Sequence, residues 1–490
     1  MIDTPSLITF IVYLTLMMAV GVYFYRTTTN LEDYLLGGRG LGRWVTAFSA
    51  QASDMSGWLM MGLPGAVYLG GMPAAWIAIG LFVGTALNWR LVAARLRVYT
   101  EITGSLTLAS FFEERFKDPT GLLRTVTALI TLIFFTIYAS SGLVASGKLF
   151  ESMFHMDYTL AVFSGGAVII ASTFLGGFLA VCYTDLIQGA LMIIAIVVVP
   201  AIACHFAGGP VAVMTAMSAK GIPSSLLAGG GLGITAIFSA AAWGLGYFGQ
   251  PHILARFMGM RSGSEAPGTT AIALVWVALS LAGAIAVGLI GISLFDGLSG
   301  GDEEKVFIHM INTVLGPWTR GIMLAAILSA IMSTIDSQLL VSSSTLTEDF
   351  YQKSIKREAS EREMMFVGRA SVIIISIIAL LLALKPGNTI LGLVAYASAG
   401  FGAAFGPVVL AALFSRETTW QAALAGMLSG TIVLVIWKSL GLGAQLYEIV
   451  PGFVANATAI IIVNRITRGA NEASRRDFDE VESIIRSFSS

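Results

Sequence analysis

Asp54 is the residue most strongly expected to have a functional role, because it is an acid inside an apolar segment. It lies within the apolar segment AFSAQASDMSGWLMMGLPGAVYLGG, two and three residues before Ser56 and Gly57. A carboxylate at bilayer depth costs at least about 2.5 kcal/mol, so it should face a cavity or a partner. No Lys or Arg lies in this segment. The partner is therefore predicted to be a bound cation or a group on another helix. The alternative is that Asp54 caps a helix or accepts hydrogen bonds from neighbouring backbone amides at a kink.

Hydroxyl side chains crowd a second apolar segment, AAILSAIMSTIDSQLLVSSSTLTEDFY. Ala330 stands three and four residues before Ser333 and Thr334, and on a helix this spacing can place one carbonyl and two hydroxyls around one point. Such a cage of oxygen atoms suits a hard cation such as Na⁺. The same hydroxyls could instead bond back to the preceding turn or bridge helices. The residues alone leave both interpretations open.

Residues 241–258, AAWGLGYFGQPHILARFM, indicate a second interrupted helix. Its three glycines weaken the helix, and Pro251 removes a backbone donor, which leaves carbonyls and amides free to bind a solute. Trp243 and Tyr247 add apolar faces with polar handles, a wall suited to a compact solute. The alternative is that these aromatic residues lie at the membrane interface, at the end of an ordinary uninterrupted helix.

The remaining polar residues give no sign of an enzyme. Asp185, at the entrance of a later apolar segment, either places negative charge on a helix N-terminus or takes part in ion coupling. The four histidines show no ligand spacing, so a transition-metal site is not expected. No GxxxxGK[ST] loop is present, which argues against an ATP-driven pump, and no nucleophile stands beside a base.

The elements that position these residues are predicted to be membrane-spanning helices. With 56% hydrophobic and 12% charged residues among 490, the chain has too little polar surface to cover a soluble globule, and its net charge of −1 excludes a basic nucleic-acid surface. We predict an all-α polytopic membrane protein of about thirteen transmembrane helices, each about 20 residues or longer. The expected spans are residues 5–25, 44–70, 72–94, 123–147, 158–181, 185–206, 230–250, 270–295, 319–346, 367–384, 389–414, 420–440 and 446–464.

The two interrupted spans are the second and the seventh, five apart. An odd separation inverts the orientation in the membrane, so spans 2–6 and 7–11 can form an inverted repeat, which is typical of secondary transporters. One span precedes this repeat and two follow it. Within the third span, Gly80 and Gly84 show the small-xxx-small spacing of close helix packing.

The distribution of basic residues predicts the orientation. An odd number of spans puts the two termini on opposite sides, and positively charged loops stay in the cytoplasm. With the N-terminus outside, only six of the 28 Lys and Arg residues face outwards: Lys148, Lys220, Lys305, Arg320, Lys385 and Lys438. We therefore expect an external N-terminus, a transporter domain over residues 1–465, and a partly helical cytoplasmic tail over residues 466–490.

Together these segments resemble the sodium/solute symporter family and, within it, the branch that carries proline. The resemblance runs nearly end to end. It implies a leucine-transporter-type inverted repeat of 5+5 helices that takes up L-proline with Na⁺ through the plasma membrane, without a cofactor beyond this coupling ion. The motifs that carry it are EDYLLGGRGLG, SDMSGWLMMGLPGAVYL, WIAIGL, LRVYTE, FFTIYASSG, FLGGFLAV, WGLGYFGQPHILARFM, AYASAGFGAAFGPVVL and YEIVPGF.

The resemblance also implies roles for individual residues. Asp54 matches an acid important to sodium coupling, beside Ser56 and Gly57, and Arg39 matches a functional arginine of an inner loop. The implied sodium ligands are backbone oxygens of Ala52, Met55 and Ala330 with the hydroxyls of Ser333 and Thr334. The implied substrate wall comprises Trp58, Tyr138, Trp243, Tyr247 and Pro251. Asp185, Asp336 and Ser337 match a second, inner cation site of related carriers.

Three alternatives stay open. Another small solute, such as pantothenate or a short carboxylate, could be carried in the same fold, because a fold does not fix its substrate. Protons could replace Na⁺ as the coupling ion, given the acids within the spans. A membrane sensor or channel with a vestigial transport core is the alternative from another class. The sequence does not predict an oligomeric state.

Overall fold

The computed structural model describes residues 4–27, 35–175, 177–356, 358–385, 389–467 and 469–488. The prediction of an all-α protein is confirmed, since no strand occurs in these ranges. Ten of the described helices are long and apolar enough to cross a membrane. The second and seventh expected spans are not among them because each is divided, and α9 (Tyr158–Leu175) is a shorter apolar helix. The expected count of thirteen stays a prediction.

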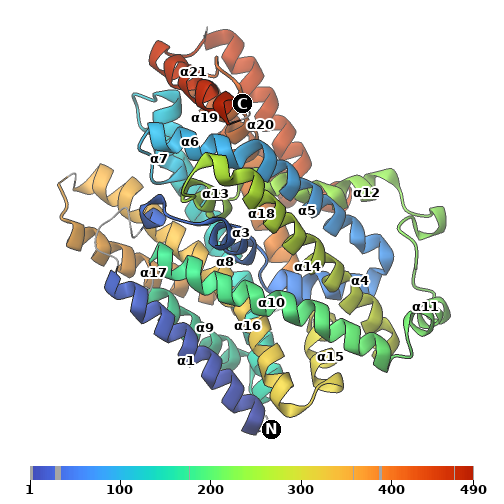
Figure 1. Cartoon of the computed structure of the whole chain (residues 1–490). Helices are drawn as coiled ribbons and strands as arrows, with labels where there is room; N and C mark the ends of the chain where they lie inside the picture. Colours follow the sequence, from blue (N-terminus) through green and yellow to red (C-terminus); the bar gives the residue numbers. More distant parts are fainter. Residues whose placement is uncertain are drawn as a thin grey trace.

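The helices follow one another in the order expected of two repeats (Figure 1). A first helix, α1 (Thr4–Thr27), precedes them. The first set comprises α3 (Arg43–Asp54) with η2 (Trp58–Gly62) and α4 (Leu63–Gly70), α5 (Ala75–Asn88) with η4 (Trp89–Ala93) and α6 (Ala94–Ile102), α7 (Leu108–Phe116), α8 (Leu122–Phe154), α9 and α10 (Phe178–Phe206).

The second set begins after the peripheral helix α11 (Pro210–Ala219). It comprises α12 (Ile234–Ala241) with η6 (Ala242–Gly249) and α13 (Pro251–Met258), α14 (Ala266–Leu294), η8 (Asp302–Lys305) with α15 (Val306–Val314), α16 (Pro317–Ser344) with η9 (Thr345–Ile355), α17 (Glu361–Ala383) and α18 (Ile390–Phe414). Helices α19 (Trp420–Ser439), α20 (Ile449–Thr467) and α21 (Glu472–Ser487) follow.

Both predicted helix breaks are present. Helix α3 ends at Asp54, Met55 leaves helical geometry with φ −84° and ψ 81°, and the chain turns helical again at Trp58. In the second set, Gln250 is extended with φ −78° and ψ 108°, and Pro251 opens α13. A proline suits this first helical position because the amide it lacks would have no partner there. Pro251 therefore starts a new half-helix.

Helix α3 lies at the centre of the molecule (Figure 1) and contacts α10, α13, α14 and α16. It thus touches its own repeat through α10 and the other repeat through the remaining three. Helix α1 packs against α10 and α16, and α8 against α9, α16, α17 and α18. The break after Asp54 is consequently surrounded by protein, as irregular backbone at membrane depth must be.

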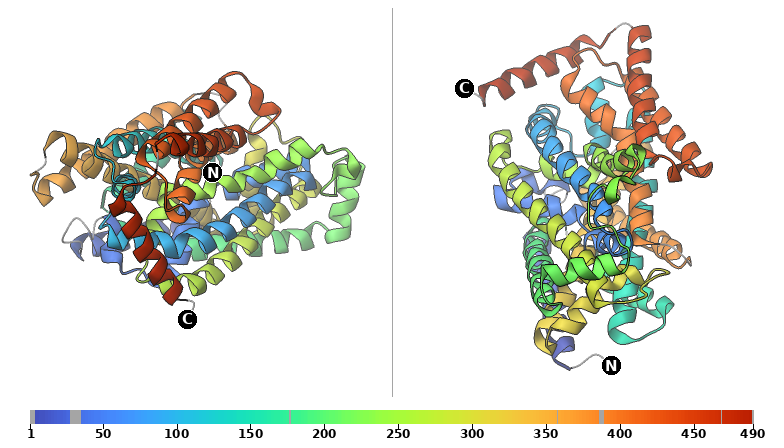
Figure 2. Two further views of the ribbon diagram at one scale, coloured as in Figure 1. Left: turned by 90° about the horizontal axis from the view of Figure 1, so that it is seen from above. Right: turned by 90° about the vertical axis from the view of Figure 1, so that its right-hand side faces the viewer.

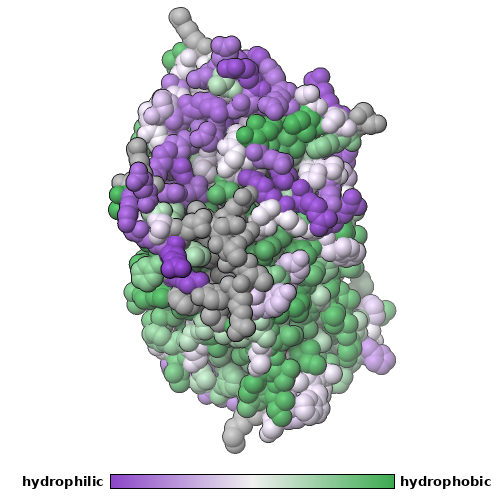
Figure 3. All heavy atoms as spheres, turned by 60° about the vertical axis from the view of Figure 1, so that its left-hand side comes forward, coloured by the Kyte–Doolittle hydropathy of each residue, from purple (hydrophilic) through white to green (hydrophobic). Residues whose placement is uncertain are grey.

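The C-terminal tail forms a packed helix. Helix α21 contacts α6 and α7, where Asp477 pairs with Lys117 at 2.9 Å and Ser474 donates to the Arg115 carbonyl at 2.9 Å. Figure 2 shows α21 at the end of the molecule opposite the start of α1. Hydrophilic side chains gather towards this same end, while hydrophobic ones cover much of the rest of the face in Figure 3. This pattern fits a body in lipid with one polar, water-facing end.

Two glycines bring the backbone of α5 into contact with the backbone at the end of α12 and in η6. A Cβ added at Gly80 would lie 2.1 Å from the Ala241 carbonyl oxygen, and one at Gly84 would lie 2.3 Å from the carbonyl oxygen of Gly244. These distances are far shorter than van der Waals contact, so only glycine fits at both positions. The small-xxx-small pair thus joins the third span to the broken seventh one.

We expect Gly80→Val to destabilise the folded protein by about 3 kcal/mol or more, at the upper end of overpacking costs, because the facing atoms are backbone and cannot change rotamer. The thermal unfolding midpoint of purified protein in detergent measures the effect. Gly21→Val on α1 is the matched control, since nothing lies within 4 Å of a Cβ there. Equal melting of the two variants would contradict the packing argument.

Candidate functional site

Four of the five expected sodium ligands lie together between α3 and α16. The Ser333 Oγ donates to the Ala52 carbonyl at 2.7 Å and lies 3.2 Å from the Ala330 carbonyl. The Thr334 Oγ1 lies 3.3 Å and 3.2 Å from the same two oxygens. All four residues are buried. Met55, the fifth, is buried in the adjacent break, and its contact with an ion stays a prediction.

This group of oxygens suits Na⁺ chemically. Two carbonyls and two hydroxyls are neutral, hard donors, which is the ligand type that hard cations prefer. A rotating hydroxyl can turn its hydrogen away and present a lone pair. In their contacts with Ala330, the Ser333 and Thr334 hydroxyls bond back to the preceding turn of their own helix. Their contacts with Ala52 instead join two helices. An ion here would hold the break of α3 against α16.

The Asp54 side chain points towards the broken seventh span. Its Oδ2 accepts from the Tyr247 hydroxyl at 2.7 Å, so a group on another helix is its partner. Its backbone carbonyl, freed where α3 ends, accepts from the Tyr138 hydroxyl at 3.0 Å and the Trp58 indole at 2.9 Å. The Ser56 Oγ accepts the Trp58 amide at 3.3 Å. Three expected substrate-wall residues therefore meet at Asp54.

The other two wall residues lie elsewhere. Trp243 stacks on Tyr447, with ring centroids 5.6 Å apart and planes at 28°, and both line a cavity of about 760 Å³ that also holds Lys438 and Glu448. Pro251 lines a narrow crevice beside Thr131. Sequence reasoning missed Tyr447, which comes just before α20, because its partner is about 200 residues away in the chain.

Asp185 lies inside α10, beyond its first turn, and is fully buried. The helix begins at Phe178, earlier than the expected span start at 185, so Asp185 cannot act as a charge on the N-terminal turn. Its Oδ2 accepts from the Arg256 guanidinium at 3.2 Å and the Ser49 hydroxyl at 2.7 Å. Sequence reasoning placed Arg256 in an inward loop and missed this ion pair.

The three residues expected at a second cation site do not form one group. Ser337 accepts a hydrogen bond from Arg256 and so joins Asp185. Asp336, the next residue towards the N-terminus, instead accepts from the Thr173 hydroxyl on α9. Adjacent residues on a helix point about 100° apart, which explains why the two side chains face different neighbours.

Arg39 links the segment before α3 to two helix ends. Its guanidinium donates to the Thr100 and Ser105 carbonyls at 3.1 Å and 2.8 Å, and to the Met258 carbonyl at 3.2 Å. Thr100 and Met258 lie in the last turns of α6 and α13, where helix carbonyls lack intrahelical partners, and Ser105 follows the end of α6. Arg39 thus ties the start of the broken second span to the end of the broken seventh span.

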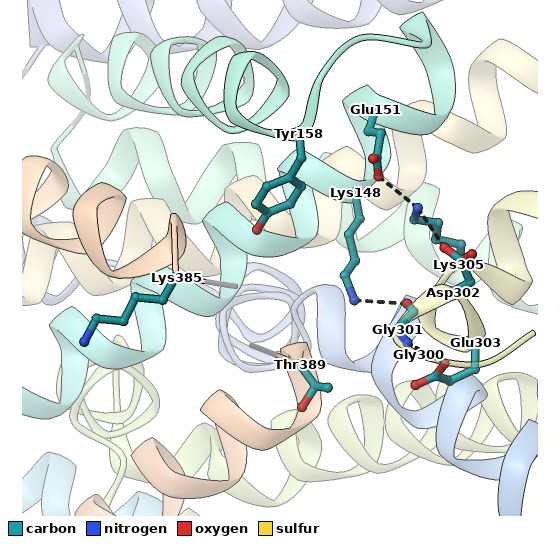
Figure 4. Close-up of a pocket in the computed structure, with 10 residues that line it drawn as sticks. All are labelled: Lys148, Glu151, Tyr158, Gly300, Gly301, Asp302, Glu303, Lys305, Lys385 and Thr389. Atoms are coloured by element: carbon teal, nitrogen blue, oxygen red, sulfur yellow. Dashed lines mark hydrogen bonds and ion pairs between the residues drawn. The ribbon is translucent and has the colours of Figure 1, made fainter. Parts of the chain in front are cut away.

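A charged cavity of about 560 Å³ lies apart from these residues, where α8, η8 and α18 meet (Figure 4). Lys148 donates to the Gly301 carbonyl at 3.1 Å and pairs with Glu304 at 2.5 Å, and Lys305 pairs with Glu151 at 2.8 Å. The buried Glu304 carboxylate also accepts two amides at the start of α18. These pairs fasten the η8 segment to its neighbours, and no predicted site residue lines the cavity.

The sequence matches known proteins over nearly its whole length. The sequence model of the sodium:solute symporter family matches residues 34–430. A sodium/proline symporter of Escherichia coli (strain K12) is 47% identical, over 99% of this chain and 98% of the relative. An osmoregulated proline transporter of Bacillus subtilis (strain 168) is 44% identical over 97% of both chains.

Solved structures show the same fold at low sequence identity. A Na⁺-coupled sialic acid symporter in a substrate-bound, outward-open state aligns with a TM-score of 0.81 at 19% identity, over 96% of this chain and 99% of that one. MhsT in complex with L-phenylalanine aligns with a TM-score of 0.54 at 14% identity, over 86% and 98%. These likenesses confirm the expected leucine-transporter-type architecture.

Proposed function

Because this chain belongs to the sodium:solute symporter family, we propose that it imports L-proline together with Na⁺ by alternating access. The relatives that match nearly its full length, at 43% to 47% identity, are named as proline transporters, most of them sodium/proline symporters. It is a transporter and not an enzyme. The observation that carries the mechanism is the meeting of the Ala52 carbonyl with the Ser333 and Thr334 hydroxyls across α3 and α16.

Sodium acts first in this mechanism. The ion binds the carbonyls of Ala52 and Ala330 with the two hydroxyls, and it thereby fixes the end of α3 against α16. Because Asp54 lies two residues after Ala52, the same step sets the position of the Asp54–Tyr247 hydrogen bond. Sodium thus favours one arrangement of the two broken spans, and a ligand shifts a population only through such differential binding.

Proline then binds between the two breaks. Its ammonium lies towards Asp54, at the negative end of α3, and its carboxylate lies towards the free amides at the start of a half-helix. Its ring contacts the aromatic side chains that the resemblance implies, with Tyr247 and Tyr138 next to Asp54. Binding of both solutes lets the repeats rock and open the opposite side.

The direction of transport follows from the membrane gradients. We place the protein in the plasma membrane with the N-terminus outside and the C-terminal helix α21 in the cytoplasm, as the basic residues favour. A negative interior contributes about 2.3 kcal/mol per charge for each 100 mV. Low cytoplasmic sodium then favours release of the ion, and proline follows.

Uptake of labelled proline into proteoliposomes tests the proposal. An imposed inward Na⁺ gradient is expected to drive accumulation, and a proton gradient of equal size is expected to drive none. Excess unlabelled proline should inhibit this uptake fully, while pantothenate and short carboxylates should not. Proton-driven uptake would refute sodium coupling. Failure of excess proline to compete would refute the substrate.

A further inference from the structure

A fully buried cation lies next to the sodium cage. Arg256 on α13 is 0% exposed, and its guanidinium donates to Asp185 on α10 at 3.2 Å and to Ser49 on α3 at 3.1 Å. It also donates to Ser337 on α16 and to the His252 carbonyl of its own helix, the latter at 3.2 Å. Four helices that the sequence scatters widely therefore converge on one positive charge.

The guanidinium lies about one helical turn from the sodium ligands along two helices. Ser49 precedes Ala52 by three residues on α3, and Ser337 follows Ser333 by four on α16. One turn is about 5.4 Å. The two groups of oxygen atoms therefore form consecutive layers between the same pair of helices, and the second layer adds the Asp185 carboxylate.

The oxygens of this second layer are of the kind that would bind a cation. Asp185 supplies a carboxylate, and Ser49 and Ser337 supply hydroxyls, a set of hard donors with one negative charge. Arg256 meets all three. Its guanidinium also lies 5.4 Å from the centre of the Phe178 ring, a contact that favours a cation. The carboxylate charge is thus balanced by a side chain.

We propose that Arg256 is a tethered counter-cation that holds the place of a second sodium ion, so that one Na⁺ crosses with each proline. This inference rests on the proposed function and specifies its stoichiometry. A side chain cannot leave the protein, so its charge adds nothing to the ion flux. Since Arg256 belongs to α13, the half-helix after the second break, its charge stays with that half-helix through the cycle.

Removal of the Arg256 guanidinium should turn the second layer of oxygen atoms into a binding site for a mobile cation. Breaking a buried ion pair on one side leaves an uncompensated charge, which is strongly unfavourable. In Arg256→Ala the Asp185 carboxylate would face the space left by the arginine, and a mobile cation is the group that can replace the lost charge. Sodium is the abundant cation under transport conditions.

The experiment measures sodium stoichiometry in proteoliposomes. Initial rates of proline uptake against Na⁺ concentration give the Hill coefficient, and the reversal potential of proline flux gives the net charge per proline. For the unmodified protein we expect a Hill coefficient of about 1 and one charge. For Arg256→Ala we expect the coefficient to rise towards 2, the limit for two sites, with two charges per proline.

Two further variants keep the test decisive. Arg256→Lys keeps a tethered cation and should retain a coefficient of about 1. Asp185→Asn with Arg256→Met removes both charges and should also retain it, because no uncompensated carboxylate is left to bind a second ion. Arg362→Ala, at an exposed arginine at the start of α17, is the control for loss of a positive charge.

The outcomes separate this inference from the proposed function. Two charges per proline in the unmodified protein would overturn the tethered cation while leaving sodium-driven proline uptake intact. An Arg256→Ala protein that transports with an unchanged Hill coefficient and unchanged charge ratio would overturn it as well. Unmodified protein that takes up no proline under a Na⁺ gradient would instead refute the proposed function itself.

Discussion

Replacing Ser333 and Thr334 together by alanine is expected to raise the sodium concentration for half-maximal proline uptake by at least about a hundredfold. Each hydroxyl is a ligand in the proposed cage, and interactions of a polar group with a charge are worth about 1.5–3 kcal/mol each. Two such losses correspond to about 3–6 kcal/mol, or roughly two to four powers of ten. Uptake at a fixed low sodium concentration would then be close to background.

The matched control for this double variant is Ser344→Ala on the same helix. Ser344 is also buried, but its hydroxyl bonds back to the Leu340 carbonyl of its own helix at 2.9 Å, ten residues after Thr334. Its removal should leave sodium dependence unchanged. Proline uptake in Ser333→Ala/Thr334→Ala with the sodium dependence of the unmodified protein would show that the ion binds elsewhere.

The second large effect is expected for Asp54→Asn. The amide oxygen can still accept the Tyr247 hydrogen bond, so the change removes charge while leaving shape and this contact nearly intact. Two unit charges about 8 Å apart at an effective dielectric of about 20 interact by roughly 2 kcal/mol, and an effect of that size corresponds to about thirtyfold in sodium affinity. Sodium-activation curves measure the change directly.

Tyr247→Phe is the complementary variant, because it removes the hydroxyl and keeps the charge of Asp54. The buried carboxylate loses a donor at 2.7 Å, and Tyr247 belongs to the expected substrate wall. We therefore expect its larger effect on the KM for proline and its smaller effect on sodium activation. If Asp54→Asn changed only the KM for proline and Tyr247→Phe changed mainly sodium activation, the roles given to these two residues would be reversed.

Local sequence chemistry predicted both breaks and the three residues that α16 supplies to the proposed sodium cage. The Ser, Gly and Pro residues around Asp54 and Pro251 marked two irregular segments, and both are present. The spacing of Ala330, Ser333 and Thr334 on one helix follows from helical periodicity alone. The Ala52 carbonyl could be added only through family resemblance, because every residue has a carbonyl and the sequence does not say which helix faces α16.

The buried ion pair escaped prediction because the span boundaries were misplaced. The seventh span was given the end 250, although residues 241–258 were expected to form an interrupted helix, and α13 (Pro251–Met258) carries Arg256 into the interior. The sixth span was expected to begin at residue 185, yet α10 starts at Phe178. Arg256 was therefore counted with an inward loop, and Gly177, the residue that precedes α10, was placed inside the expected span 158–181.

The glycine contact between α5 and η6 limits where motion can occur. Helix α5 belongs to the first repeat, and α12 and η6 belong to the second; at Gly80 and Gly84 no side chain separates their backbones. Packed elements slide past one another when side chains change rotamers, and at these two glycines there is no side chain to change. We therefore expect these elements to move together as one rigid body during the transport cycle. We expect the pivots of the transport cycle at Met55, directly after Asp54, and at Gln250, because the backbone leaves helical geometry at both residues.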